Sequence, residues 1–268
     1  MDYFQAFILA VVQGVTEFLP VSSSAHLILT PRLFGWDDQG LAFDVAVHVG
    51  TLFAVIIFLR NEIQQIIPAW FAGFKKQSWN EQGRLAWWVL LATIPVCLVG
   101  VLGSNWIEAN LREPYVIAIS TLIFGLLLGL ADRGGDQNDK RLLSMSLVHA
   151  VLIIGMAQVL ALIPGVSRSG VTMTAALFLG YQRSAAAKFS FLLAVPTIAL
   201  PGFLKGKELI ETIDTVAWGS LMLGVVVSAI FALLCMHWFI RFVERIGMQP
   251  FVYYRILLAI FIGIVFYF

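Results

Sequence analysis

The chain has 268 residues, of which 60% are hydrophobic and 12% are charged. An average soluble domain is about 25% charged, so this composition indicates an integral membrane protein. The formal net charge is +1 and the sequence holds no large basic cluster, which argues against nucleic acid as a partner.

Apolar stretches long enough to cross a hydrocarbon core of about 30 Å predict six transmembrane helices. They lie at residues 43–60, 85–103, 114–131, 183–203, 216–240 and 253–268. No ten-residue segments of alternating hydrophobicity occur, so we expect an all-α integral membrane fold, with residues 1–268 forming a single membrane domain. Residues 1–30 lack the basic start and the cleavage site of a signal peptide, and we expect the mature chain to begin at Met1.

The connections between these spans differ in positive charge. Ten Lys and Arg residues lie in one set, at 60–84, 132–141 and 241–255, and four lie in the other, at 31–42, 104–113 and 204–215. Because cytoplasmic connections retain Lys and Arg, we expect the first set inside and the second outside. Both ends of segment 1–42 then lie outside and both ends of segment 142–182 lie inside, so each segment is predicted to be a re-entrant helical hairpin.

A hairpin followed by three spans therefore occurs twice. The odd number of spans turns the second unit upside down, which predicts an inverted repeat. The first repeat covers about 1–131, with its hairpin at 1–42, and the second covers about 142–268, with its hairpin at 142–182. Inverted repeats with broken helices place their site near the middle of the membrane, where the half-helices converge.

A polar stretch, QGVTEFLPVSSSAH, interrupts the first hairpin at residues 13–26. Gln13 and Glu17 are four residues apart and so share one face of a helix. A charged side chain in the middle of a membrane costs roughly 3 kcal/mol on the insertion scale, so Glu17 indicates a function.

The second half of that stretch predicts an anion site. Pro20 ends the first helix, and Ser22 or Ser23 is placed to cap the next one. The N-terminus of a helix binds anions through its free N–H groups and its dipole. His26 lies about one turn further on, within reach of Ser22 or Ser23 as an acid or base.

The other hairpin repeats this device at residues 164–172, PGVSRSGVT. Pro164 and Gly165 break the helix, Ser167 can cap the next one, and Arg168 stands at its start. A guanidinium binds phosphate oxygens through a fixed fork of donors and stays charged when buried. Together with a carboxylate, an amide and an imidazole from the first hairpin, Arg168 favours metal-assisted phosphoryl transfer.

Structural interpretations stand beside the functional ones. Ser24, Ser169 and Thr172 can bond to their own backbone or to neighbouring helices. Glu17 and Arg168 can form a purely structural ion pair between the hairpins, and His26 can serve helix packing.

Other polar residues within the predicted spans receive no catalytic role. Asp44 and His48, four residues apart at the start of a span, either support the residues of the site or are interfacial, and the interfacial interpretation is favoured. Lys188, near the inner end of its span, is expected to reach toward the membrane surface. His149 and His237 carry no motif.

The two motifs resemble those of the undecaprenyl-diphosphate phosphatase family, whose members affect bacitracin sensitivity. The first family signature is met at Gln13, Glu17, Phe18 to Ser23, and His26, and the second at Pro164, Gly165, Ser167, Arg168, Ser169 and Thr172. The stretch FSFLLAVP at 189–196 is also similar to the family. The resemblance covers essentially the whole chain.

This resemblance implies an enzyme that removes the terminal phosphate from undecaprenyl diphosphate and so recycles the lipid carrier used for cell-wall polymers. It implies a polyprenyl diphosphate substrate, a homodimer in the bacterial inner membrane, a divalent cation such as Mg²⁺ or Ca²⁺, and a site facing the periplasmic or outer side. Its fold would have six spans and two re-entrant hairpins.

By the same resemblance, Ser23 or His26 attacks the phosphorus, Glu17 binds the metal or acts as a base, and Arg168 holds the diphosphate. Many members have Glu where Gln13 stands. An amide oxygen can still ligate Mg²⁺ or Ca²⁺, but it cannot act as a base. The expected substrate ligands are the remaining hydroxyls of the two motifs, namely Ser22, Ser24, Ser167, Ser169 and Thr172.

Two other classes remain as alternatives. A secondary transporter or lipid flippase shares the inverted-repeat architecture, and it would bind the anion without hydrolysing it. The type-2 phosphatidic acid phosphatases act on similar lipids, but no His follows Ser167 and Arg168 at the spacing that their motif requires.

Overall fold

The computed structural model describes residues 1–76, 78–135, 137–210 and 218–267, and in these ranges the chain is helical without strands. The α-helices are α1 (Tyr3–Thr16), α2 (Ser23–Phe34), α3 (Gly40–Phe58), α4 (Arg60–Lys76), α5 (Glu81–Asn110), α6 (Pro114–Asp132), α7 (Met156–Val159), α8 (Arg168–Phe178), α9 (Arg183–Ile210), α10 (Trp218–Ile246) and α11 (Gln249–Tyr267). A 3₁₀ turn, η1 (Leu142–Ser144), a π-helical segment, η2 (Val148–Gly155), and a second 3₁₀ turn, η3 (Leu160–Leu162), complete the described elements; η2, α7 and η3 follow one another without a gap.

Six of these helices are long and apolar enough to cross a membrane, which confirms the six predicted spans and makes the chain a multi-pass membrane protein. The helices are α3, α5, α6, α9, α10 and α11. The last span begins at Gln249, earlier than the predicted residue 253, because Pro250 is tolerated in the first turn of a helix.

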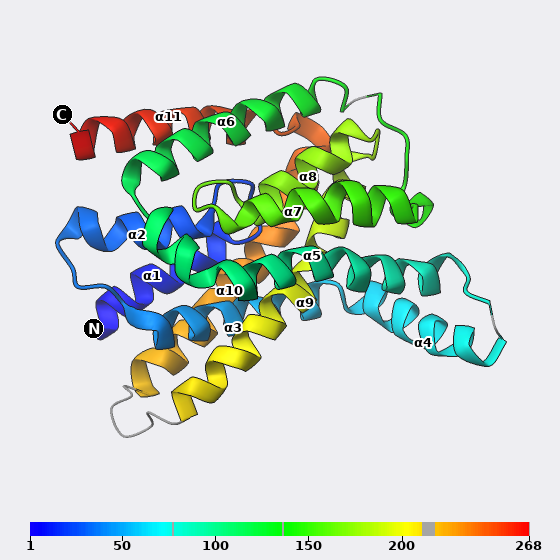
Figure 1. Ribbon diagram of the computed structural model, residues 1–268, viewed down its shortest axis with the longest axis horizontal. Coiled ribbons are helices and arrows are strands. Elements are labelled where there is room, and N and C mark those ends of the chain that lie inside the picture. Colours follow the sequence, from blue (N-terminus) through cyan, green and yellow to red (C-terminus); the bar gives the residue numbers. More distant parts are fainter. Residues whose placement is uncertain (77, 136, 211–217, 268) are drawn as a thin grey trace.

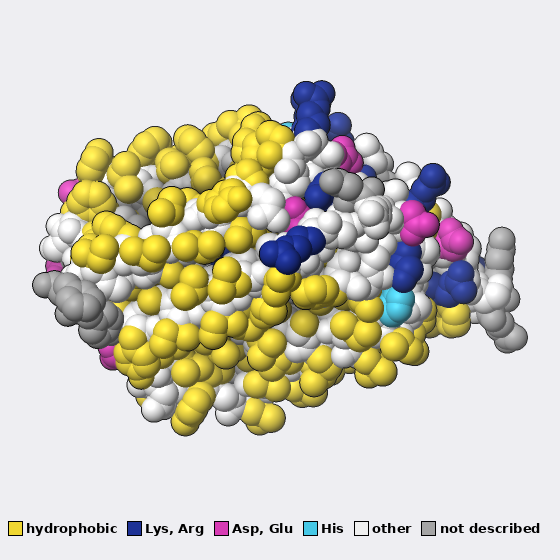
Figure 2. Space-filling model, turned by 90° about the horizontal axis from the view of Figure 1, so that it is seen from above, with side chains coloured by type: hydrophobic (Ala, Val, Ile, Leu, Met, Phe, Trp, Pro, Cys, Tyr) yellow, Lys and Arg dark blue, Asp and Glu magenta, His cyan; other side chains and the backbone are white. Residues whose placement is uncertain are grey.

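The connections between the spans gather at two opposite ends of the molecule (Figure 1). The N-terminus, the α2–α3 connection and the α5–α6 connection lie at one end, and the α4–α5 connection lies at the other. On the face seen in Figure 2, Lys and Arg side chains concentrate toward the end of the α4–α5 connection, and hydrophobic side chains cover most of the rest. Part of the predicted connection 204–215 lies outside the described residues, which resume at 218.

Two helix pairs are interrupted in the middle of the molecule. α1 and α2 are separated by a break at residues 17–22, and the η2–α7–η3 helix and α8 are separated by a break at residues 163–167. Each pair returns to the end of the molecule from which it starts (Figure 1). The predicted positions of both helix breaks are therefore confirmed.

The segment 60–84, expected to be a connection, contains α4. This helix packs against α5 through aromatic rings: the ring centroid of Trp87 on α5 lies 5.5 Å from that of Trp70 and 6.1 Å from that of Phe74. At the start of α4, Glu62 accepts a hydrogen bond of 2.7 Å from Lys188 Nζ on α9. Lys188 thus pairs with a carboxylate, where the sequence suggested that it only reaches toward the surface.

Candidate active site

Each helix that follows a break is capped by a serine with an unusual backbone conformation. Ser22 and Ser167 have φ angles of 74° and 71°, in the left-handed region that non-glycine residues rarely adopt. Ser22 Oγ accepts from the N–H of Ala25 at 3.5 Å, and Ser167 Oγ accepts from that of Gly170 at 3.1 Å. Such strain costs of order 1–3 kcal/mol and gathers at functional sites. The predicted serine caps are therefore present in both motifs.

Further residues match between the two motifs at the same spacing of 145 positions. The hydroxyls of Ser22 and Ser24 lie 3.2 Å apart, and those of their counterparts Ser167 and Ser169 lie 3.1 Å apart. Gln13 and its counterpart Gln158 are both fully buried, and the Oε1 atom of each has no hydrogen-bond partner among the described residues. The two breaks thus share one local construction.

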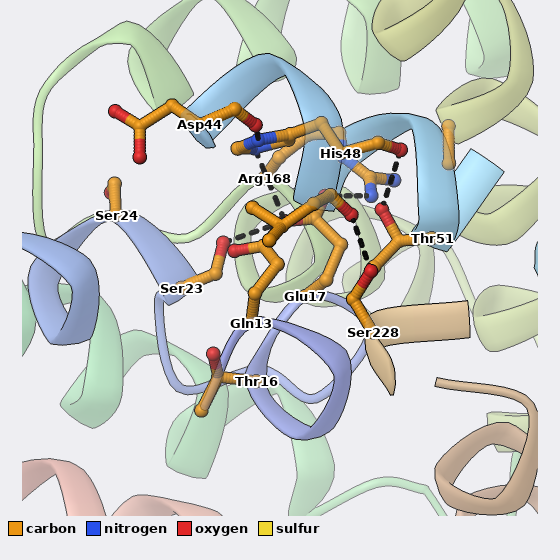
Figure 3. A network of polar contacts seen from close by, with 12 residues as sticks. Gln13, Thr16, Glu17, Ser23, Ser24, Asp44, His48, Thr51, Arg168 and Ser228 are labelled. Atoms are coloured by element: carbon orange, nitrogen blue, oxygen red, sulfur yellow. Dashed lines mark hydrogen bonds and ion pairs between the residues drawn. The ribbon is translucent and has the colours of Figure 1, made fainter. Parts of the chain in front are cut away.

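The carboxylate of Glu17 joins the two motifs (Figure 3). Its Oε1 accepts a hydrogen bond of 2.9 Å from Arg168 Nη2. Its Oε2 accepts one of 2.6 Å from the hydroxyl of Ser23 and one of 3.0 Å from Nε2 of Gln13. Glu17 is only 8% exposed, so this carboxylate depends on these donors rather than on bulk water.

Arg168 keeps donors available for a ligand. Its Nη1 donates to the backbone carbonyl of Ser190 at 2.9 Å and its Nη2 donates to Glu17, while a guanidinium has five N–H donors in all. The guanidinium also lies 5.9 Å from the centroid of the Phe18 ring. This packing holds the planar fork in place, which favours binding of phosphate oxygens.

A cavity of about 400 Å³ opens beside this carboxylate. Its polar side chains are Glu17, Asp44, His48, Gln158, Arg168 and Thr197. The rest of its lining is Leu41, Val45, Val96, Ala161, Leu162, Ile198, Pro201 and Gly202, from α3, α5, η3 and α9. The cavity therefore offers both a charged part and an apolar part.

His48 lines this cavity, so of its two interpretations the structure favours support of the site. Its Nε2 lies 3.8 Å from Glu17 Oε2. Its Nδ1 lies 2.7 Å from the backbone carbonyl of Asp44, and because a carbonyl only accepts, Nδ1 carries a hydrogen. The ring nitrogen that faces the Glu17 carboxylate is therefore the one not bonded to Asp44.

His26, by contrast, turns toward α11. Its Nδ1 donates to the backbone carbonyl of Ser22 at 2.7 Å, and its Nε2 bonds to the hydroxyl of Tyr254, on whose ring the imidazole stacks. Both ring nitrogens are thus engaged away from Glu17 and Ser23. The attack by His26 that the family resemblance implies remains a prediction.

The remaining motif hydroxyls bond mostly to the backbone. Ser169 Oγ donates to the carbonyl of Leu19 at 2.8 Å, which ties α8 to the first break. Thr172 Oγ1 donates to Ser190 Oγ at 2.8 Å and also contacts the carbonyl of Arg168. The roles of Ser22, Ser24, Ser167, Ser169 and Thr172 as substrate ligands remain predictions.

Arg255 was counted among the charges of a cytoplasmic connection, and this was wrong. It lies within α11 and is 0% exposed. Its guanidinium donates to backbone carbonyls of both breaks and of α6, at Pro20, Gly165, Val166 and Thr121. Irregular backbone at membrane depth must be satisfied by protein, and Arg255 provides donors for it.

Comparison with known proteins identifies the chain's relatives. A family model described as bacitracin resistance protein BacA matches residues 6–261. The chain belongs to the BacA family. It is 55% identical over 260 residues to the undecaprenyl-diphosphatase of Saccharophagus degradans, covering 97% of this chain and 96% of that protein. It is 51% identical over 264 residues to the undecaprenyl-diphosphatase of Teredinibacter turnerae, covering 98% and 99%.

The two residues predicted to bind a divalent cation, Gln13 and Glu17, lie next to each other in this BacA family member. The described residues contain no group of three or more His, Cys, Asp and Glu side chains able to hold a metal. The Gln13 amide lies beside the Glu17 carboxylate, with Nε2 at 3.0 Å from Oε2, and its Oε1 has no hydrogen-bond partner among the described residues. Carboxylate and amide oxygens are ligands that Mg²⁺ and Ca²⁺ accept. The divalent cation remains a prediction, and Gln13 and Glu17 are the residues that would hold it.

Proposed function

We propose that this member of the BacA family hydrolyses undecaprenyl diphosphate to undecaprenyl phosphate and inorganic phosphate, and so recycles the lipid carrier for cell-wall polymer synthesis. One observation carries the proposal: the Glu17 carboxylate accepts hydrogen bonds from Ser23 and from Arg168 at the same time. A hydroxyl, a base and a phosphate-binding guanidinium then stand at one point. The names of the relatives support the lipid substrate.

In the first step, Ser23 Oγ attacks the terminal phosphorus and its proton passes to Glu17 Oε2, 2.6 Å away. The bond between that phosphorus and the bridging oxygen breaks, and its electron pair leaves with undecaprenyl phosphate. In the second step, water attacks the phosphorus of the phosphoserine and the bond from phosphorus to Ser23 Oγ breaks. Glu17 returns its proton to Ser23 Oγ, and the proton of the attacking water leaves with the inorganic phosphate. The remaining donors of Arg168 hold the phosphoryl oxygens as charge shifts among them.

The surroundings fit an anionic lipid. The N-termini of α2 and α8, where Ser23 and Arg168 lie, present backbone N–H groups and positive dipole ends to the phosphates. The apolar lining of the cavity, which includes Val96 and Ile198, accommodates the first part of the isoprenoid chain.

Gln13 and Glu17 would hold the divalent cation, Mg²⁺ or Ca²⁺. When bound, such an ion neutralises negative charge on the diphosphate. Glu17 would then share its oxygens between the ion and the hydroxyl of Ser23.

The placement in the membrane is part of the proposal. We infer that α1–α2 and η2–α8 are re-entrant hairpins of an inverted repeat, that the protein resides in the bacterial inner membrane as a homodimer, and that the site opens to the periplasmic side. The matched serines and glutamines of the two breaks support the repeat. The excess of Lys and Arg in segments 60–84 and 132–141 and near the end of α10, at Arg241 and Arg245, supports the orientation. The homodimer rests on the family resemblance.

Phosphate release by the purified protein tests the function. With undecaprenyl diphosphate in detergent micelles, we expect stoichiometric inorganic phosphate and undecaprenyl phosphate, and loss of both products in Arg168→Ala. The transporter alternative predicts binding of the lipid with no phosphate released. That result from folded protein supplied with Mg²⁺ or Ca²⁺ would exclude the proposed reaction.

A further inference from the structure

Arg255 connects the two breaks at corresponding positions. Pro20 and Gly165 are 145 positions apart, the same spacing that relates Ser22 to Ser167. The guanidinium donates to the carbonyl of Pro20 through Nη1 at 3.1 Å and to that of Gly165 through Nη2 at 2.9 Å. One side chain thus holds equivalent backbone atoms of both hairpins.

The residues that follow these carbonyls carry the proposed chemistry. Ser23 lies three positions after Pro20, and Arg168 lies three positions after Gly165. Their side chains meet on the two oxygens of Glu17, at 2.6 and 2.9 Å. Any sliding of one break past the other changes the distance between the hydroxyl and the guanidinium.

The surroundings of Arg255 are built to fix its position. Its side chain is fully buried, and Nε donates to the carbonyl of Thr121 at 3.1 Å. Glycines leave room for it on both sides: a Cβ at Gly125 on α6 would lie 2.9 Å from Arg255 Cβ, and one at Gly170 on α8 would lie 3.1 Å from Nη1. A rigid planar fork in such a tight space sets the spacing of the groups to which it donates.

We propose that Arg255 is a positioning residue for the phosphatase reaction, which sets the relative placement of Ser23 and Arg168 by bridging the two hairpin breaks. This inference rests on the proposed function. It assigns Arg255 no contact with the substrate, because its hydrogen bonds go to backbone carbonyls. Its effect on catalysis passes through the distance between Ser23 and Arg168.

Arg255→Lys tests the proposal, because lysine keeps the charge but loses the fork that reaches several carbonyls. A displacement of about 1 Å can lower a rate by about 100-fold, and we expect a loss of kcat of that order. The protein should keep its size on a sizing column, while its unfolding temperature falls because buried carbonyls lose donors. The control Arg241→Lys, at an exposed position on α10, should keep the wild-type kcat and KM.

Coupling to Arg168 separates positioning from a general structural role. We expect Arg255→Lys to have a much smaller effect on kcat in an Arg168→Lys background than in the wild type, because the misplaced group is already impaired. An equal factor in both backgrounds, or wild-type kcat in Arg255→Lys, would overturn the proposal. If instead the wild-type protein itself releases no phosphate, the proposed function fails and not only this inference.

A second variant serves if Arg255→Lys does not fold. Gly125→Ala removes no hydrogen-bond donor, but its new Cβ would lie 2.9 Å from Arg255 Cβ and so displaces the side chain. We expect the same loss of kcat and the same coupling to Arg168→Lys. Gly263→Ala, on α11, is the matched control, because a Cβ there meets nothing within 4 Å. Equal kcat values for Gly125→Ala and Gly263→Ala would contradict the proposal.

Discussion

Arg168 and Glu17 form a 2.9 Å ion pair across 151 positions of the sequence, with 14% and 8% of their side chains exposed. The pair comes from two different hairpins, so it exists only when the whole fold is in place. Removing one partner of a buried pair leaves an uncompensated charge, which typically destabilises a protein by about 3–5 kcal/mol. Tests of this site therefore need variants that preserve charge.

Arg168→Lys is such a variant. It keeps the positive charge and loses the bidentate fork. We therefore expect the transition-state free energy calculated from kcat/KM to rise by roughly 2 to 4 kcal/mol, the scale of one preorganised transition-state donor. Phosphate release and a thermal unfolding curve measure the two effects separately. Near-normal turnover in Arg168→Lys, together with better folding of the double variant Glu17→Ala/Arg168→Ala than of either single variant, would show that the pair is only structural.

Ser23→Ala removes the proposed nucleophile. We expect turnover to fall by roughly 10³-fold or more, with the fold retained because the hydroxyl of Ser23 is only partly buried. Brief reaction with labelled lipid followed by acid quenching should trap phosphate on Ser23 in the wild type and in His26→Ala. Label on His26, or a wild-type rate in Ser23→Ala, would show that Ser23 is not the nucleophile.

The proposed divalent cation is tested by removing it. Activity should vanish in excess chelator and return with Mg²⁺ or Ca²⁺, and Glu17→Ala should lose far more activity than Gln13→Ala. We expect Gln13→Glu to remain active and to bind the ion more tightly, because a second carboxylate replaces an amide. Binding is measured by calorimetry in the absence of substrate. Wild-type activity that persists in chelator would remove the ion from the mechanism.

The orientation is tested by cysteine labelling. In a variant lacking Cys97 and Cys235, a single cysteine at exposed Asp37, in the α2–α3 connection, should react with an impermeant thiol reagent in intact cells. One at exposed Ser78, in the α4–α5 connection, should react only after the membrane is opened. The reverse pattern would turn the site toward the cytoplasm.

The sequence was sufficient to predict the six spans, both helix breaks and the meeting of Glu17 with Arg168. Length and hydropathy determine spans directly, and a buried carboxylate and a buried guanidinium both require partners. The surroundings of His48 and Arg255 were not predicted, because hydropathy assigns a polar residue near the end of a span to the membrane surface whichever way its side chain points. Only tertiary packing brings His48 to Glu17 and Arg255 to the two breaks.

Arg255 also has a consequence for the order of biosynthesis. It follows its partners in the two breaks by 235 and 90 positions, so both hairpins are made before the side chain that joins them. Ribosomes add about 5–20 residues per second, so the carbonyls of the breaks lack this hydrogen-bond donor for several seconds during synthesis. We therefore expect nascent chains that lack α11 to hold the hairpins loosely, and hydrolysis to begin only after this helix has inserted.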